Sequence, residues 1–239
     1  MPIRAVLFDK DGTFVDFMAT WGPAIAQTMR TLSGGDNAAL VRLAEVNRYD
    51  LATGRLSPES PFIAEASVDF ARRWADALGV PMTPAFHRRM DALLDAGALA
   101  NVAPLADPEL VFAALKTLSC RVGVVTNDTE AGARAQCDKL GLLPHLDAII
   151  GYDSGFGRKP DAGPVLAALE QLGVQPEEAM LVGDSRHDLA AARAAGTLAV
   201  AVLSGFADAD ALTPHADHVL DDIRGLPDLV RRLAMQPAR

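Results

Sequence analysis

The sequence predicts an α/β protein whose core is a Rossmann-like, doubly wound parallel sheet, interrupted early in the chain by an inserted all-α domain. Two observations lead to this prediction. Short apolar runs that end abruptly in polar residues recur along the chain, a pattern typical of strands buried in a parallel sheet. Helical patterns alternate with these runs from Cys120 onward, but the alternation is absent between about residues 15 and 99.

The predicted strands are short and apolar. The first covers Ile3 to Phe8 and ends abruptly at Asp9. Later strands are expected at Arg121–Val125, Ala148–Ile150, Ala179–Val182, Leu198–Leu203 and His218–Leu220.

Helices are predicted between these strands in the sequence, from residues that typically begin or end a helix. Asp107 and Pro108 suit the N-cap and the first position of a helix. Three further helices each stop before a glycine, the residue that commonly ends a helix in the left-handed conformation. They are predicted at Glu130–Leu140, Pro164–Leu172 and Ser185–Ala195.

Residues 15–99 carry apolar residues at helical spacing and no convincing strand. Trp21, Ile25 and Met29 are four residues apart, and so are Phe70 and Trp74. We therefore expect two domains, an α/β core from residues 1–14 and 100–239, and a helical domain from residues 15–99. Within the insert, Arg48, Tyr49 and Arg55 either face a substrate or lie on the surface, and the sequence leaves both open.

Composition narrows the class of partner. The formal net charge of −9 disfavours nucleic acid and anionic membranes, and it also repels phosphorylated metabolites unless a metal or local cations are present. The two cysteines, Cys120 and Cys137, suit a reducing compartment. No signal peptide or membrane-spanning run is recognised. We expect a cytoplasmic protein, either a monomer or a homodimer.

A pair of carboxylates follows the first predicted strand, in Asp9-Lys10-Asp11-Gly12-Thr13. Ligands of open α/β sheets bind beyond the carboxyl ends of strands, so Asp9 and Asp11 can share one site. One carboxylate can attack an electrophile while the other moves a proton. The alternative is an ordinary acidic turn. Lys10 is expected to point away from both carboxylates if the backbone is extended there.

Polar groups that suit an anion follow later strands. Thr126 and Asn127 stand where a strand gives way to a helix, and they can donate hydrogen bonds to an anion. The alternative is that Asn127 or Asp128 only caps the helix. Lys159, followed by Pro160, can supply a fixed positive charge, or can be a solvated surface residue.

Two further carboxylates follow the strand at Ala179–Val182. Asp184 lies at the strand end, and Asp188 lies one turn into the next helix. Oxygen ligands of this kind suit Mg²⁺. Ser185 and Asp188 also have the spacing of a capping box, so Asp188 can be structural, and the two roles are compatible.

Together, these motifs resemble the haloacid dehalogenase superfamily, in particular its phosphoglycolate-phosphatase-like members with a helical (C1-type) cap. The resemblance extends from the first strand to Ala216–Ile223, and the insert matches the position of the cap. The motifs that carry it are FDKDGT (Phe8–Thr13), VVTND (Val124–Asp128), GRKPD (Gly157–Asp161) and VGDSRHDLAAARAAG (Val182–Gly196).

The resemblance implies a magnesium-dependent phosphatase for a small phosphorylated metabolite, phosphoglycolate-like or a sugar phosphate. It implies that Asp9 is the nucleophile, which becomes an aspartyl-phosphate, and that Asp11 is the acid and then the base. Thr126 and Lys159 would be catalytic and bind the phosphoryl oxygens. Asn127 would help bind the substrate and orient the site. The cap would close over the site and select the substrate.

The same resemblance implies a Mg²⁺ site formed by Asp9, the main-chain carbonyl of Asp11, and Asp184, with Asp188 binding directly or through water. Charge supports this, because four carboxylates with one lysine would repel a phosphate dianion unless a metal and a protonated carboxyl offset them. Asp11 argues against a dehalogenase. A phosphomutase and, less favoured, a non-catalytic phosphate-binding module are the alternatives.

Overall fold

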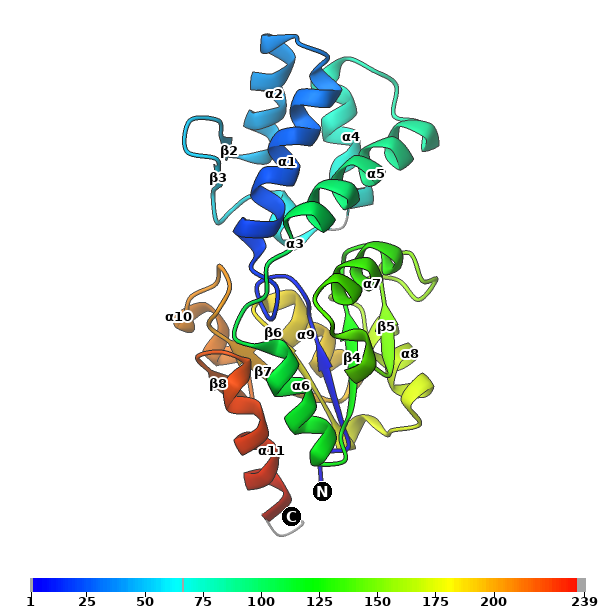
Figure 1. The fold of residues 1–239 in the computed structure, drawn as a ribbon, viewed down its shortest axis with the longest axis vertical. Coiled ribbons are helices and arrows are strands. Elements are labelled where there is room, and N and C mark those ends of the chain that lie inside the picture. The colour runs from blue at the N-terminus through cyan, green and yellow to red at the C-terminus, as the bar shows by residue number, and fades with distance from the viewer. Residues whose placement is uncertain (1, 66, 236–239) are drawn as a thin grey trace. The chain divides into compact units, whose positions relative to one another are not determined.

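The computed structural model describes residues 2–65 and 67–235. The chain divides into two compact units, one from the N-terminal residues through Asp16 together with Pro104 onward, and the other from Phe17 to Ala103 (Figure 1). These limits lie within a few residues of the predicted ones, 1–14 with 100–239 and 15–99. That the smaller unit works as a cap stays a prediction.

The larger unit is built on a parallel sheet, as predicted. Its six strands lie in the order β5-β4-β1-β6-β7-β8, and all neighbours run parallel. Strand β1 is therefore central, with β4 on one side and β6 on the other. The strands are β1 (Ala5–Phe8), β4 (Arg121–Val125), β5 (Ala148–Ile150), β6 (Ala179–Gly183), β7 (Leu198–Val202) and β8 (His218–Leu220).

Helices cover both faces of this sheet. Successive side chains of a strand point to opposite faces, so Leu7 and Phe8 mark the two sides of β1. Leu7 belongs to a buried cluster with residues of α8 and α9, whereas the ring of Phe8 lies 4.8 Å from that of Phe112 in α6. The helices are α6 (Pro108–Thr117), α7 (Glu130–Lys139), α8 (Gly163–Leu172), α9 (Arg186–Ala195), α10 (Ala209–Leu212) and α11 (Leu226–Met235), with short 3₁₀ turns at η1 (Leu143–His145), η2 (Pro176–Glu178), η3 (Thr213–His215) and η4 (Ile223–Gly225).

The smaller unit is helical, and its predicted apolar stripes form its core. Trp21, Ile25, Met29 and Trp74 are buried. The indole N–H of Trp74 donates to the side-chain oxygen of Asn47 at 2.8 Å, so these two buried polar groups satisfy each other. The helices are α1 (Phe17–Ser33), α2 (Asn37–Asn47), α3 (Pro61–Ala64), α4 (Ser67–Leu78) and α5 (Pro84–Asn101).

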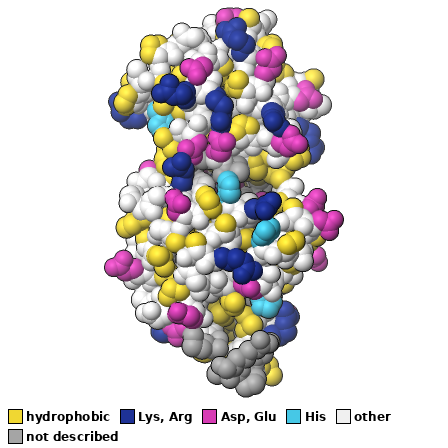
Figure 2. Space-filling model, turned by 180° about the vertical axis from the view of Figure 1, so that it is seen from behind, with side chains coloured by type: hydrophobic (Ala, Val, Ile, Leu, Met, Phe, Trp, Pro, Cys, Tyr) yellow, Lys and Arg dark blue, Asp and Glu magenta, His cyan; other side chains and the backbone are white. Residues whose placement is uncertain are grey.

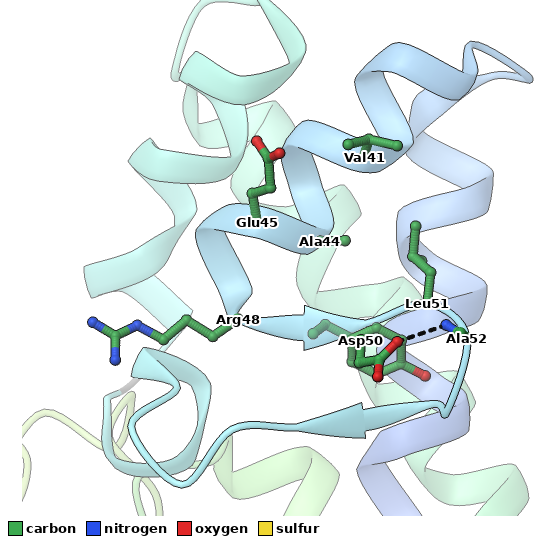
Figure 3. A pocket seen from close by; sticks show the side chains of 8 residues that line it. Val41, Ala44, Glu45, Arg48, Asp50, Leu51 and Ala52 are labelled. Carbon is green, nitrogen blue, oxygen red and sulfur yellow. Dashed lines mark hydrogen bonds between the residues drawn. The ribbon is translucent and has the colours of Figure 1, made fainter.

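This unit also contains a hairpin that the sequence did not predict, β2 (Tyr49–Asp50) with β3 (Arg55–Leu56). Strands of two residues are too short to produce a periodic pattern. The hairpin and α2 line a groove (Figure 3). Of the insert residues considered as substrate contacts, Tyr49 is buried and its hydroxyl donates to the Gly22 carbonyl at 3.2 Å, whereas Arg48 pairs with Glu59. Both side chains therefore have partners within the helical unit.

The distribution of charged side chains on the surface (Figure 2) agrees with the acidic net charge of the sequence. On the face shown in Figure 2, Lys and Arg side chains are interspersed with Asp and Glu rather than gathered into one basic patch. Within residues 2–65 and 67–235, no helix combines the length and the apolar character that crossing a membrane requires.

Candidate active site

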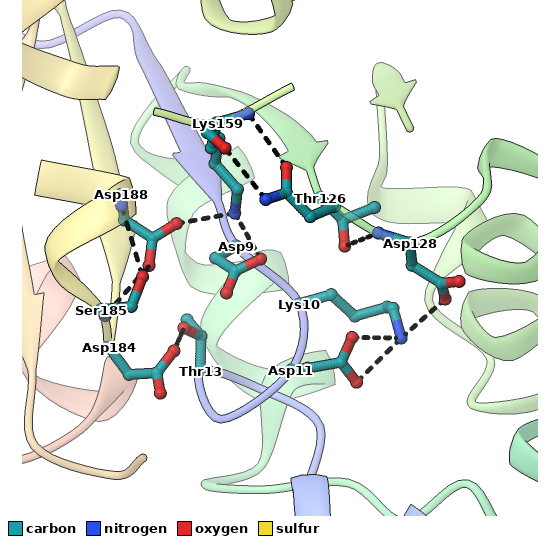
Figure 4. A network of polar contacts seen from close by, with 11 residues as sticks. Asp9, Lys10, Asp11, Thr13, Thr126, Asp128, Lys159, Asp184, Ser185 and Asp188 are labelled. Carbon is teal, nitrogen blue, oxygen red and sulfur yellow. Dashed lines mark hydrogen bonds and ion pairs between the residues drawn. The ribbon is translucent and has the colours of Figure 1, made fainter. Parts of the chain in front are cut away.

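Three carboxylates meet beyond the carboxyl ends of the two central strands β1 and β6. Asp9 follows β1, Asp184 follows β6, and Asp188 lies in the first turn of α9 (Figure 4). One carboxylate oxygen from each of the three lies within 4.8 Å of the others. The parallel strands explain this convergence, because their carboxyl ends share one edge of the sheet.

Lys159 lies between two of these carboxylates. Its ammonium contacts Asp9 Oδ1 and Asp188 Oδ1, each at 2.6 Å, and its side chain is 3% exposed. Burial alone would lower the pKa of this lysine, but Asp188 and Asp9 raise it above its ordinary value. Lys159 is therefore not the solvated surface residue that the sequence left as an alternative.

Asn127 fixes the backbone that presents this lysine. Its side-chain amide donates to the Lys159 carbonyl at 3.0 Å, and its side-chain oxygen accepts from the Lys159 N–H at 2.9 Å. The helix α7 is capped by Thr129, whose hydroxyl accepts from the Gly132 N–H. The alternative that Asn127 or Asp128 provides the cap is therefore wrong. A direct contact of Asn127 with a substrate stays a prediction.

Thr126 is buried at the end of β4, and its hydroxyl oxygen accepts from the Asp128 N–H at 3.1 Å. That bond occupies a lone pair and leaves the hydroxyl proton able to donate. The predicted role of Thr126 at a phosphoryl oxygen is compatible with this geometry and stays a prediction.

Asp188 has a structural role that the sequence anticipated. It forms a capping box with Ser185 at the start of α9, in which its Oδ2 accepts from the Ser185 N–H at 3.0 Å and from the Ser185 hydroxyl at 2.6 Å. The other oxygen, Oδ1, accepts from Lys159. Since both oxygens already serve protein donors, Asp188 is less suited than Asp184 to bind a metal directly.

Two glycines make room for the carboxylate of Asp184. A Cβ added at Gly12 or at Gly205 would overlap this carboxylate. The hydroxyl of Thr13 donates to Asp184 Oδ1 at 3.3 Å, and the hydroxyl of Ser204 donates to the Gly12 carbonyl at 2.8 Å. Sequence reasoning assigned no role to Thr13, Ser204 or Gly205. The only available signal was that Ser204 and Gly205 end the predicted strand at Leu198–Leu203.

The crowding perturbs the carboxylates. Burial, and next the nearby Asp188 carboxylate, raise the pKa of Asp9 from 3.8 to about 7, although Lys159 opposes the shift. Burial, followed by the charges of Asp9 and Asp188, raises the pKa of Asp184 well above its ordinary value. When all three carboxyl groups are ionised, the cluster has more negative charge than the single ammonium can offset, and the raised pKa values reflect that repulsion together with burial.

A pH-dependent stability follows from Asp9. Because its pKa is higher in the folded protein than the ordinary 3.8, the folded state binds the extra proton, and stability falls as the pH rises from 3.8 to about 7. Asp9→Asn removes this loss. In EDTA at about pH 8, we expect the variant to have a higher Tm than the wild type. At about pH 5, we expect this difference in Tm to be smaller. Thermal melts of both proteins at both pH values measure this difference. A difference in Tm that does not change with pH contradicts the prediction.

The donor set fits a hard divalent cation. Asp9, Asp184 and Asp188 offer only oxygens, the ligands that Mg²⁺ prefers. Three carboxylates with one ammonium carry two net negative charges if all are ionised, which a divalent cation would neutralise. Glycine backbone surrounds the Asp184 carboxylate where larger residues would overlap it.

One sequence expectation fails at this site. Lys10 was expected to point away from both neighbouring carboxylates, but its ammonium contacts Asp11 Oδ2 at 2.7 Å. The expectation assumed an extended backbone. The chain turns tightly instead, because the N–H groups of Thr13, Phe14 and Val15 all bond to the Lys10 carbonyl, so strand alternation does not apply.

Comparison with known proteins identifies the family of the chain. Residues 3–196 match the model of the haloacid dehalogenase-like hydrolase family. A phosphoglycolate phosphatase of Rhodospirillum rubrum is 32% identical over 226 residues, covering 94% of this chain and 90% of the relative. An N-acetylmuramic acid 6-phosphate phosphatase of Pseudomonas aeruginosa is 29% identical over 239 residues, covering 97% and 96%.

Solved structures share the fold. A crystal structure described as a predicted phosphoglycolate phosphatase from Haemophilus somnus superimposes with a TM-score of 0.73. The match covers 95% of this chain and 97% of the other, at 19% sequence identity. At this identity the likeness supports the fold and not a shared substrate.

Proposed function

The chain belongs to the haloacid dehalogenase-like hydrolase family and is a phosphoric monoester hydrolase, and on this premise we propose that it hydrolyses a small phosphorylated metabolite through an aspartyl-phosphate, with Mg²⁺ as cofactor. The observation that supports the proposal most is the convergence of Asp9, Asp184 and Asp188 around the buried ammonium of Lys159. Phosphoglycolate and sugar phosphates are the candidate substrates, because the relatives are named for such activities.

In the first step, a carboxylate oxygen of Asp9 attacks phosphorus, and the bond from phosphorus to the leaving oxygen breaks. Asp11 donates a proton to that oxygen, so the alcohol leaves neutral. In the second step, Asp11 takes a proton from water, whose oxygen attacks the same phosphorus. The bond between Asp9 and phosphorus breaks, which releases inorganic phosphate and restores both carboxyl groups.

The remaining residues hold the phosphoryl group and prepare the site. Lys159 and Thr126 would bind the phosphoryl oxygens, and Asn127 holds the Lys159 backbone in place. Asp9, the Asp11 carbonyl and Asp184 would hold Mg²⁺, with Asp188 supporting it. When bound, the cation offsets the negative charge that would otherwise repel a phosphate dianion.

The direct test is phosphate release from a panel of small esters, including phosphoglycolate and N-acetylmuramic acid 6-phosphate, in Mg²⁺ and in EDTA. We expect metal-dependent release, with the preferred ester identifying the substrate class. Transfer of phosphate to a second position of a sugar, without release into water, would point to a phosphomutase. No turnover of any ester would refute the proposal.

Gly205→Ala tests the metal site without replacing a ligand. The φ of Gly205 lies outside the left-handed region that disfavours alanine, but a Cβ there would overlap the Asp184 carboxylate. We expect Asp184 to be displaced and the Mg²⁺ concentration for half-maximal activity to rise about 10- to 100-fold, as for other residues that orient a ligand.

The matched control is Gly225→Ala. The nearest atoms to its Cβ would be those of the Leu220 side chain, the closest of them at 3.2 Å. We expect its magnesium dependence to equal that of the wild type. An unchanged magnesium dependence in Gly205→Ala would show that Asp184 does not bind the metal in the position described.

A further inference from the structure

Lys10 is a second buried lysine, besides Lys159, whose ammonium is paired with carboxylates. Its side chain is fully buried. The ammonium contacts both Asp11 oxygens, at 2.9 and 2.7 Å, and it also contacts Asp128 Oδ2 at 3.1 Å and Gln136 Oε1 at 2.7 Å. Figure 4 shows Lys10 turned toward Asp11 and Asp128, away from Asp9.

The contacts join three separate parts of the core unit. Asp11 belongs to the turn after β1, Asp128 to the segment between β4 and α7, and Gln136 to α7 itself. Gln136 Nε2 donates to Asp128 Oδ2 at 3.3 Å, which closes the network. Asp128 Oδ1 is in turn held by the Thr129 N–H at 2.7 Å. The partners of Lys10 are therefore fixed by the core and not by solvent.

Such a network restricts the conformation of Asp11. An ammonium that contacts both oxygens of a carboxylate fixes its side-chain orientation, and a buried ammonium is not free to move away from its partners. The two carboxylates of Asp9-Lys10-Asp11 are thus directed to different lysines, Asp9 to Lys159 and Asp11 to Lys10. The turn keeps the two functional groups apart although they are two residues from each other.

We propose that Lys10, anchored by Asp128 and Gln136, is a positioning residue that sets the orientation of the Asp11 carboxyl group for proton transfer to the leaving oxygen. The proposal rests on the proposed function, in which Asp11 is the acid. Lys10 acts through Asp11 and needs no contact with the substrate. It goes beyond the motif, in which the residue between the two aspartates has no assigned role.

The test compares two leaving groups in Lys10→Met. An alkyl phosphate needs a proton on its leaving oxygen, whereas p-nitrophenyl phosphate releases a stable anion and depends little on an acid. We expect kcat/KM to fall about 100-fold for the alkyl ester, the effect of a misplaced catalytic group, and much less for the aryl ester. The matched control is Lys139→Met, which removes an exposed lysine of α7 and should change neither rate.

Each outcome is decisive. Equal losses for both esters would mean that Lys10 only supports the fold or the metal site, and no loss would mean that it does not position Asp11; either result overturns the proposal. If Lys10→Met does not fold, Lys10→Arg keeps the buried charge but moves its donors, and it is judged by the same ratio of the two losses.

A crystal structure of the folded variant separates failure of this proposal from failure of the proposed function. If the wild type hydrolyses no ester of the panel, the proposed function fails and the comparison of leaving groups cannot be made. An Asp11 carboxylate that leaves its position beside Asp128 in the variant then supports the positioning role. A carboxylate that stays in place refutes it.

Discussion

Asp9→Asn is expected to abolish turnover, lowering kcat by about 10⁴-fold or more, as the loss of a nucleophile does in other covalent mechanisms. The amide has nearly the same shape as the carboxylate but cannot form the acyl-phosphate bond. Its nitrogen also replaces one of the oxygens offered to the metal. Phosphate release from the preferred ester measures the loss. Rapid acid quenching with labelled substrate should trap phosphoprotein in the wild type and none in the variant.

The control for this variant is Asp138→Asn, which removes an exposed carboxylate of α7 in the same unit. It should retain wild-type turnover and wild-type labelling. Phosphoprotein of undiminished amount in Asp9→Asn would place the nucleophile elsewhere and would overturn the mechanism, even if turnover is reduced.

Lys159→Met is expected to lower kcat/KM by about 10²- to 10³-fold, the usual effect of removing one donor aimed at developing charge. Methionine keeps most of the buried length but removes the ammonium that lies 2.6 Å from Asp9 and Asp188. Since that ammonium repels a cation, the variant should bind Mg²⁺ at least as tightly as the wild type. Steady-state kinetics and a Mg²⁺ titration measure the two effects separately.

Opposite signs of these two effects make the prediction specific. A variant that simply distorted the site would lose both turnover and metal affinity, and that result would contradict the assigned role. Lys139→Met serves again as the control for loss of an exposed lysine.

Much of the fold could be predicted from local patterns. The first strand was recognisable because the run Ile3–Phe8 is apolar and the polar Asp9 marks its end. In the structure, the four residues of β1 are fully buried. The helices α8 and α9 were recognisable because Gly173 and Gly196 end them in the left-handed conformation. The hairpin β2–β3 was missed, since pairs of residues carry no periodic signal.

The positions of the candidate site residues could be predicted better than their contacts. The resemblance implied that Asp9 and Asp184 lie together, and the parallel sheet explains it, because the carboxyl ends of its strands share one edge. The partners of Lys10 were not predictable, because Gln136 is brought to it by tertiary structure from 126 residues away. The hydrogen bond from the Asn127 side chain to the Lys159 backbone joins residues 32 apart in sequence. It also depends on tertiary structure and was not predictable from the sequence.

The central place of β1 in the sheet also affects how the protein folds. Ala5 pairs with Arg121 on one side and with Ala179 on the other, so the strand that carries the candidate nucleophile is made long before either partner. Contacts of such high sequence separation form slowly, because the chain must first lose the entropy of closing a long loop. During synthesis, β1 is therefore expected to stay unpaired until β4 and β6 have been made. The local contacts of the helical unit can form before then. We expect catalytic competence to be acquired late in folding, only after β6 has joined the sheet.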